Sequence, residues 1–441
     1  MSTTSKQKEI VYNELTENYD KSLNHSGING ERLALRLAEL SEIGLTEEEG
    51  SNRISFSQEE KSAKELVKQW MSEAGLKVTE DGAGNVFGRT EGKNDLPAIL
   101  SGSHVDSVPN GGHFDGPLGV LAALEVAEAW KELNYQPTKP FEVVIFTDEE
   151  GARFNGGLTG SRAIVGELNL EEQLKLTDFE EKSFEEVVKQ VGLTPDGFLK
   201  ARRDLSKIEA FVEVHIEQGK RLEKERIPVG VVTGIAGPCW LNVVFRGAAG
   251  HAGNTPMDDR KDALTAASEF VLKVQQLPPT VSSSAVATVG KMHVHPNGVN
   301  VIPGEVKLTV DIRDIYKDTR DELVSLIVQT GKEIAAVNDI DFQFEEALTV
   351  SPVPIDKKMQ EKAGQAVKET LGIDPYYLPS GAGHDAMVVG RHVPMAMLFT
   401  QSKDGISHNP KEWSSLNDCV QTIHVLKRLI EKLAEENEGG K

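Results

Sequence analysis

Cysteine is scarce in this sequence, with only Cys239 and Cys419 among 441 residues. Two thiols cannot form a disulfide framework or a cysteine-rich zinc site. A catalytic thiol is also disfavoured, because Cys239 follows a proline between two expected domains and Cys419 lies near the start of an expected helix. The chemistry of the chain is therefore expected from other side chains.

Positive charge is in deficit, since 48 Lys and Arg residues face 69 Asp and Glu residues, for a net charge of −21. Proteins that bind nucleic acids or anionic membranes need a basic surface to neutralise phosphates. We therefore expect no nucleic acid and no membrane among the partners of this chain. The excess of carboxylates is compatible with a local cationic pocket or with a site that collects metal cations.

Long apolar runs are missing as well. The first 20 residues, MSTTSKQKEIVYNELTENYD, contain no stretch typical of a signal peptide, and the longest apolar runs have the length of strands. Hydrophobic residues make up 39% and charged residues 27%, which is typical of globular proteins. These features predict a cytoplasmic enzyme or binding protein.

Short apolar runs alternate with helical patterns in the first half of the chain. Such alternation favours an α/β fold with a mostly parallel sheet. One helix has clear ends, because Ser57 is a suitable N-cap and Gly75 a suitable stop. We expect helices at 31–40, 57–75 and 117–131, and strands at 98–100, 141–147 and 211–216.

A second pattern begins after residue 230, where a glycine-rich stretch precedes new strands. Two helices, at 258–277 and 318–337, and antiparallel strands form an α+β insert. The first pattern resumes at about 348, with a helix at 356–371, a strand at 394–399 and a helix at 415–435 that ends in ENEGGK. We predict a catalytic domain at 1–234 and 348–441, with 1–30 as a loosely ordered extension, interrupted by a smaller domain at 235–347.

Four clusters of His, Asp, Glu and Gln residues follow predicted strands. Open α/β sheets place their sites at the carboxyl ends of strands, so the clusters are expected at one edge. Imidazole mixed with carboxylate suits zinc, manganese, cobalt or nickel better than calcium. The clusters are His104, Asp106 and Asp115; Asp148, Glu149 and Glu150; His215 and Gln218; and His408.

Each cluster also has a simpler interpretation as a structural histidine, a solvated acidic loop or a turn. The coincidence of four clusters at one sheet edge argues against these interpretations. Competing motifs are absent from the sequence, which contains no HExxH, GxSxG or Walker-type phosphate loop. His293 and His295 share one strand face and offer another possible metal site, although surface exposure is the simpler interpretation.

Several segments together resemble the amidohydrolase, or hydantoinase/carbamoylase, branch of the M20 metallopeptidase family. They are SHVDS, GGHFDGPLGV, TDEEGARF, VEVHIEQG, HAGNTPM, NVIPG, SGAGHDA and GISHNPKEW. The resemblance covers the chain from about residue 30. It implies a discontinuous, zinc-peptidase-like catalytic domain with a mostly parallel sheet, interrupted by a smaller α+β domain that serves as a lid and dimerises.

The resemblance also implies two divalent metal ions per subunit, which would be zinc, manganese, cobalt or nickel. Asp115 would bridge the two ions. Glu149 would act as the general acid and base, and Asp106 would orient a histidine ligand. The remaining ligands would be His104, Glu150, His215 and His408.

In the smaller domain, His251 resembles a histidine that reaches the neighbouring subunit and stabilises an oxyanion. Asn300 and Arg313 resemble residues that hold the polar groups of the substrate. A surface ion pair of Arg313 with Asp311 or Asp314 is the alternative. The residues that resemble ureido-binding elements are Gln218, Gly381 and His384.

The implied reaction is hydrolysis of the ureido C–N bond of an N-carbamoyl-L-amino acid, a small-molecule substrate, by a homodimer formed through the smaller domain. Allantoate amidohydrolase is the alternative activity, followed by β-ureidopropionase, and an aminoacylase or dipeptidase is more distant. A protein of another class, an inactive ligand-binding paralogue, would retain the fold without hydrolysis. The intact set of implied ligands and Glu149 argues against that alternative.

Overall fold

A computed structural model describes residues 3–435, which form two compact units. The first unit runs to Val232 and continues at Ile355–Leu378 and from His384 onward. The second unit contains Thr233–Pro354 and Pro379–Gly383. The ENEGGK segment expected to end the last helix lies outside the described residues. No helix within residues 3–435 is both long enough and apolar enough to cross a membrane.

The N-terminal segment is more ordered than the sequence indicates. Thr3–Thr16 form helix α1, which packs on α2, Gly30–Ser41. Val11 and Leu15 are buried, with exposures of 5% and 3%. These two residues lie four positions apart and therefore share one face of the helix. Two apolar residues in a polar segment are too few for hydrophobic periodicity to reveal a helix.

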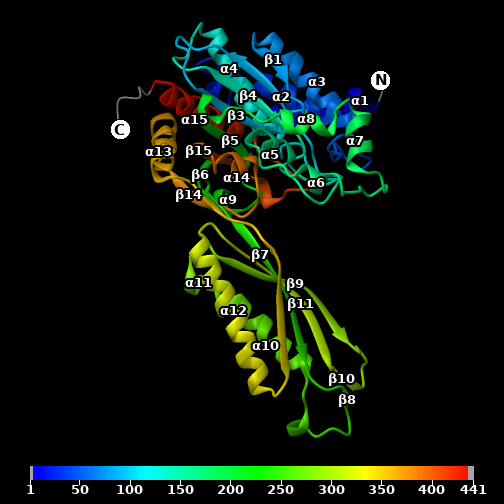
Figure 1. The fold of residues 1–441 in the computed structure, drawn as a ribbon. Coiled ribbons are helices and arrows are strands. Elements are labelled where there is room, and N and C mark those ends of the chain that lie inside the picture. The colour runs from blue at the N-terminus through cyan, green and yellow to red at the C-terminus, as the bar shows by residue number, and fades with distance from the viewer. Residues whose placement is uncertain (1–2, 436–441) are drawn as a thin grey trace. The chain divides into compact units, whose positions relative to one another are not determined.

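The sheet of the first unit has parallel strands at its centre and antiparallel strands at its edges (Figure 1). Its order is β1-β2-β4-β3-β5-β15-β6-β13, with β14 also paired to β6, and β4, β3, β5 and β15 are parallel neighbours. Every residue of β3, β4 and β15 is buried, as expected for central parallel strands covered on both faces. The bounds are β1 Lys77–Glu80, β2 Val86–Thr90, β3 Ala98–His104, β4 Phe141–Phe146, β5 Ile208–Ile216, β15 Met395–Thr400 and β6 Val229–Ile235.

Helices α4, Pro117–Glu132, and α15, Leu416–Glu435, pack against each other and against the central strands. A Cβ atom on Gly119 of α4 would lie 2.2 Å from the backbone oxygen of Val214 in β5. Only glycine therefore allows this close approach of helix and strand. The contact fixes the start of α4 relative to the end of β5, where two of the predicted site residues lie.

The remaining helices of this unit frame the sheet. Helix α3, Gln58–Glu73, begins as predicted, because the Ser57 side chain accepts a hydrogen bond from the Glu60 amide. The sequence analysis assigned no elements to 151–207, where four short helices form around an aromatic cluster of Phe56, Phe154, Phe184 and Phe198. The other helices are α5 Thr159–Val165, α6 Leu170–Gln173, α7 Phe184–Gln190, α8 Pro195–Lys200, α9 Arg221–Glu225, α13 Lys357–Leu371 and α14 Asp385–Val389.

The second unit is an antiparallel sheet of order β12-β7-β11-β9, with α10 and α12 along one face (Figure 1). In β11, Val306, Leu308, Val310 and Ile312 alternate into the core beneath these helices. The intervening positions, Asp311 and Arg313, are on the opposite face. The bounds are β7 Gly237–Arg246, β8 Gly250–His251, α10 Ala263–Gln276, α11 Pro278–Val281, β9 Val286–His295, β10 Val301–Ile302, β11 Glu305–Asp314, α12 Lys317–Val337 and β12 Asp341–Thr349. Strands β13, Val353–Pro354, and β14, Tyr376–Ser380, belong to the larger sheet that contains β6.

Candidate metal centre

The predicted ligands converge at one edge of the first unit's sheet. His104 ends β3, His215 lies near the end of β5, and Glu150 follows β4. Asp115 precedes α4, and His408 lies in the loop between β15 and α15. Because β4, β3, β5 and β15 run parallel, their carboxyl ends share this edge, which is where α/β sheets place their sites.

Two triplets of potential ligand atoms form there, and both contain Asp115. In the triplet of His104, Asp115 and His215, and in that of Asp115, Glu150 and His408, the atoms lie within 4.8 Å of one another. Asp115 Oδ1 is 3.1 Å from His215 Nε2 and 3.6 Å from His104 Nε2. The other oxygen, Oδ2, is 3.4 Å from His408 Nε2, which is also 3.4 Å from Glu150 Oε2. Asp115 thus presents one oxygen to each group.

The histidine rings are oriented by the backbone. His104 Nδ1 lies 3.0 Å from the carbonyl oxygen of Asp106, and His215 Nδ1 lies 3.0 Å from that of Ile216. A carbonyl only accepts hydrogen bonds, so we assign the proton of each neutral ring to Nδ1. The lone pair of each Nε2 then faces Asp115, which is the tautomer that a metal ligand requires.

Charge is concentrated at this edge. Burial opposes protonation of His104, but Glu149 and Asp115 outweigh it and raise the pKa of the imidazole. Burial also opposes ionisation of Asp115, but His215 and the other imidazoles hold the pKa of its carboxyl well below the ordinary range. Burial, followed by the charge of Asp115, raises the pKa of Glu150 to about 7.

These residues fit a divalent transition-metal ion. His104 Nε2 is buried and has no hydrogen-bond partner, an arrangement that is costly unless something binds the atom. The donors are imidazole nitrogens and carboxylate oxygens, the set that suits zinc and its neighbours in the periodic table. The described residues of the first unit therefore form a cluster whose donors suit a metal ion.

Asp106 lies beside His104, the histidine it was predicted to orient, but the contact comes mainly from its backbone. Its Oδ1 is 3.6 Å from His104 Nδ1, and the backbone carbonyl makes the shorter contact. The carboxylate instead accepts hydrogen bonds from the amides of Glu149 and Glu150, at 3.3 and 3.2 Å, and from the Ser55 hydroxyl at 3.0 Å. Asp106 thereby holds the backbone that carries the two glutamates.

Glu149 lies within this cluster, with Oε2 3.6 Å from His104 Nε2. Burial raises the pKa of its carboxyl well above the ordinary range, and Glu150 and Asp385 add to this effect while His104 opposes it. General acids and bases in enzymes are commonly carboxyl groups whose pKa is raised by burial in this way. Glu149 belongs to neither triplet, so its carboxyl is not among the grouped ligand atoms.

Two predicted substrate residues lie beside the triplets. Gln218 Nε2 donates to Asp115 Oδ2 at 2.7 Å, and its buried Oε1 has no hydrogen-bond partner. The ring of His384 lies 4.5 Å from that of His215, measured between centroids. Burial, followed by the charge of His215, lowers the pKa of His384 well below its ordinary value.

The other predicted substrate residues belong to the second unit. His251 and Asn300 lie together, because Ala252 N donates to Asn300 O at 3.0 Å and His251 pairs with Val301. Arg313 Nη1 donates to the carbonyl oxygen of Gly381 at 2.7 Å. Arg313 Nη2 is also 2.8 Å from Asp311 Oδ2. This is one of the surface ion pairs given in the sequence analysis as the alternative to substrate binding.

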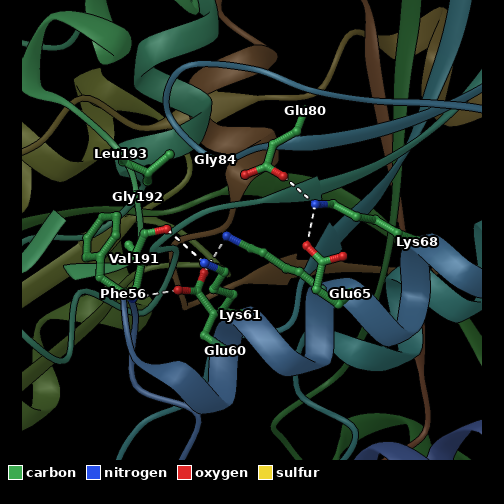
Figure 2. A pocket seen from close by; sticks show the side chains of 11 residues that line it. Phe56, Glu60, Lys61, Glu65, Lys68, Glu80, Gly84, Val191, Gly192 and Leu193 are labelled. Atoms are coloured by element: carbon green, nitrogen blue, oxygen red, sulfur yellow. Dashed lines mark hydrogen bonds and ion pairs between the residues drawn. The ribbon is translucent and has the colours of Figure 1, made fainter. Parts of the chain in front are cut away.

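A cavity of about 340 Å³ lies beside α3 (Figure 2). Three lysines and three glutamates line it, and Lys68 is paired with Glu65 and Glu80. Lys64 is buried, pairs with Glu60, and donates from Nζ to Thr147 Oγ1 at 2.8 Å. Thr147 directly precedes the Asp148–Glu150 segment. The charges of this cavity are balanced internally, and its buried lysine supports the strand end that carries Glu149.

Sequence reasoning missed Ser407 and Glu412, which contact Asp115 or its backbone. Ser407 Oγ lies 2.8 Å from Asp115 Oδ2, and Glu412 Oε1 accepts the amide of Asp115 at 3.0 Å. Both residues are in the GISHNPKEW segment that carries His408. Their nearness to His408 in the sequence was the available signal. The contacts themselves could not be predicted, because Asp115 lies almost 300 positions away.

Comparison with known proteins agrees with this geometry. The model of the peptidase family M20/M25/M40 matches residues 100–432. The chain belongs to the peptidase family M20/M25/M40. The family match spans both triplets and the whole second unit.

Several curated and solved relatives align with almost the whole chain. An N-carbamoyl-L-amino acid amidohydrolase of Geobacillus stearothermophilus is 44% identical over 409 residues, 92% of this chain and 99% of the relative. An allantoate amidohydrolase of Bacillus subtilis is 36% identical over 90% of this chain and 95% of the relative. A solved hydantoinase/carbamoylase-family amidase of Burkholderia multivorans has a TM-score of 0.87 at 36% identity, covering 93% and 99% of the two chains. The predicted family branch and α/β fold are confirmed.

We predict that metal uptake by the metal-free protein is coupled to proton release. Hydrogen bonding to Asp115, opposed by burial and reinforced by Glu150, raises the pKa of His408 to about 9. A cation must therefore displace a proton at pH 7, and affinity should rise between pH 6 and 9 by roughly tenfold per unit for each proton displaced. Calorimetry in buffers of different ionisation enthalpy measures the release.

His392→Gln is the matched control, because His392 is partly exposed and pairs with Glu167 away from the triplets. The metal affinity of this variant should depend on pH as steeply as that of the wild type. Metal affinity that is independent of pH over this range would contradict the assignment of His408 as a ligand.

Proposed function

We propose that this chain is a metal-dependent amidohydrolase that cleaves the ureido C–N bond of N-carbamoyl-L-amino acids. The observation that carries the proposal is the pair of triplets that share Asp115, with Glu149 beside them. The relatives named as N-carbamoyl-L-amino acid amidohydrolases support the choice of substrate. The products would be the L-amino acid, carbon dioxide and ammonia.

The proposed centre holds two divalent ions per subunit, which zinc, manganese, cobalt or nickel suit. His104 and His215 would complete one ligand set, and Glu150 and His408 the other, with Asp115 in both. Ions bound there supply Lewis-acid charge, which lowers the pKa of water and polarises a carbonyl group.

Glu149 is the proposed general base and acid. Its carboxylate would take a proton from the water that attacks the ureido carbonyl carbon and return it to the leaving nitrogen. Asp106 fixes the Glu149 backbone through an accepted N–H bond at 3.3 Å. Gln218 is held at Asp115, and its unpartnered Oε1 offers an acceptor for a ureido N–H group.

The second unit supplies the proposed contacts to the polar ends of the substrate. His251 Nδ1 accepts hydrogen bonds from the amides of Gly253 and Asn254, at 3.1 and 3.2 Å. The ring proton is therefore on Nε2, which can donate to the oxyanion of a tetrahedral intermediate. Arg313 and Asn300 are the proposed partners of the substrate carboxylate, with Gly381 and His384 near the ureido group.

A homodimer formed through the second unit is part of the proposal, because His251 would act on a neighbouring subunit. Sedimentation of the active enzyme tests it, and a fully active monomer would contradict it. The predicted cytoplasmic location stays a prediction from the sequence.

Allantoate hydrolysis is the second candidate, because an allantoate amidohydrolase is also a relative at 36% identity. A substrate panel separates the two. It contains N-carbamoyl-L-methionine, N-carbamoyl-β-alanine, allantoate, ureidoglycolate and an N-acetyl amino acid, each with manganese-loaded protein.

We expect the N-carbamoyl-L-amino acid to release ammonia fastest, and chelation followed by dialysis to abolish the activity. Full activity after exhaustive metal removal would contradict metal dependence. Preference for allantoate would favour the second candidate, and hydrolysis of the N-acetyl compound alone would indicate an aminoacylase. A chain that binds metal but cleaves no panel member would support the inactive paralogue.

The Glu149→Gln variant should lower kcat by about two to four orders of magnitude, because the amide cannot accept the proton from water. Metal content should remain that of the wild type, since Glu149 belongs to neither triplet. Elemental analysis and steady-state kinetics on the same preparation measure both quantities.

Glu150→Gln is the matched control, because it alters the neighbouring carboxylate, which is a member of the second triplet. This variant should lose metal as well as activity. If Glu149→Gln lost metal to the same degree, Glu149 would be a ligand and not the proton carrier.

A further inference from the structure

Glu412 joins the loop that carries Asp115 to the loop that carries His408. Its side chain is buried at 2% exposure. Oε1 accepts the amides of Phe114 and Asp115, at 2.9 and 3.0 Å. Oε2 accepts the Ser407 hydroxyl at 2.9 Å. One carboxylate thus holds segments almost 300 residues apart in the sequence.

The packing around Glu412 leaves little freedom to either loop. A Cβ atom on Gly112 would lie 2.0 Å from Glu412 Oε1, so the glycine lets the backbone close onto the carboxylate. Next to Glu412, Trp413 makes an edge-on contact with Phe114, with ring centroids 5.4 Å apart. The connection is therefore a built contact and not a chance surface pairing.

Ser407 stands between two carboxylates. Its Oγ lies 2.8 Å from Asp115 Oδ2 and 2.9 Å from Glu412 Oε2, but a hydroxyl has only one proton to donate. When Asp115 Oδ2 binds a cation, the proton can be donated to Glu412. Glu412 thereby provides an alternative acceptor that removes one of the two side-chain donors to Asp115 Oδ2, the other being Gln218 Nε2.

The second triplet depends on this connection more than the first. His104 and His215 belong to buried strands, and backbone carbonyls orient their rings. His408 lies in a loop, with a left-handed φ of 53° and a side chain that is 50% exposed. Its position relative to Asp115 is set by the loop that Ser407 and Glu412 anchor.

We propose that Glu412 is a positioning residue that sets the affinity of the second triplet, Asp115, Glu150 and His408, for its cation, with Ser407 as the hydrogen-bond donor that changes partner. The inference rests on the proposed function, in which each triplet binds a divalent ion. Glu412 belongs to neither triplet of potential ligand atoms.

The test titrates metal-free wild type, Glu412→Gln and Ser407→Ala with manganese and measures the first and second dissociation constants by calorimetry. In Glu412→Gln the amide oxygen still accepts the two backbone amides, but the NH₂ group donates to Ser407 and directs the Ser407 proton to Asp115 Oδ2. We expect the second dissociation constant to rise by about 10- to 100-fold and the first to change little. Ser407→Ala removes the Ser407 donor while Gln218 remains, and it should leave the second constant unchanged or lower.

Glu125→Gln is the matched control, because Glu125 is also buried and accepts a backbone amide, from Asn29, but lies outside both triplets. It should leave both constants at wild-type values even if it lowers the melting temperature. A wild type that binds one equivalent overturns the two-ion proposal and this inference with it. The inference alone is overturned if the wild type binds two equivalents of manganese but Glu412→Gln leaves the second dissociation constant unchanged. It is also overturned if Glu412→Gln raises both dissociation constants equally.

Discussion

The contact of one carboxylate with three imidazoles is the interaction on which the site depends. Asp115 is buried, yet its two oxygens lie 3.1–3.6 Å from the Nε2 atoms of His104, His215 and His408. A buried carboxylate is stable only when charge or hydrogen bonds compensate for lost hydration. The three imidazoles provide part of that compensation, and in the proposed two-ion centre cations at both oxygens would provide the rest.

The surrounding fold supports this contact at several levels. Parallel strands bring His104 and His215 to one edge, and Gly119 lets α4, which follows Asp115, pack closely on β5. Asp106 and Lys64 hold the segment that carries Glu149 and Glu150 from two sides. The site is therefore carried by rigid elements, with the loop of His408 as the part that needs a separate anchor.

The sequence was sufficient to predict much of the fold and the convergence of the proposed ligands at one sheet edge. Strand ends rich in His, Asp and Glu, such as those of β3 and β5, are local signals, and the parallel arrangement then brings them together. The role of Asp106 could not be predicted, because hydrogen bonds to the amides of Glu149 and Glu150 depend on a turn that no short motif specifies. Glu412 was hidden for a similar reason, since its partners are on a distant loop. Helix α1 was missed because only a few apolar residues, among them Val11 and Leu15, define its buried face.

The central claim is that Asp115 is shared by two cations, and anomalous X-ray diffraction from crystals of the manganese-loaded protein tests it most directly. The account predicts two anomalous peaks per chain, about 3.5–4 Å apart, with one oxygen of Asp115 next to each. One peak should lie beside His104 and His215, and the other beside Glu150 and His408. A single peak, or two peaks of which one has no contact with Asp115, would contradict the claim.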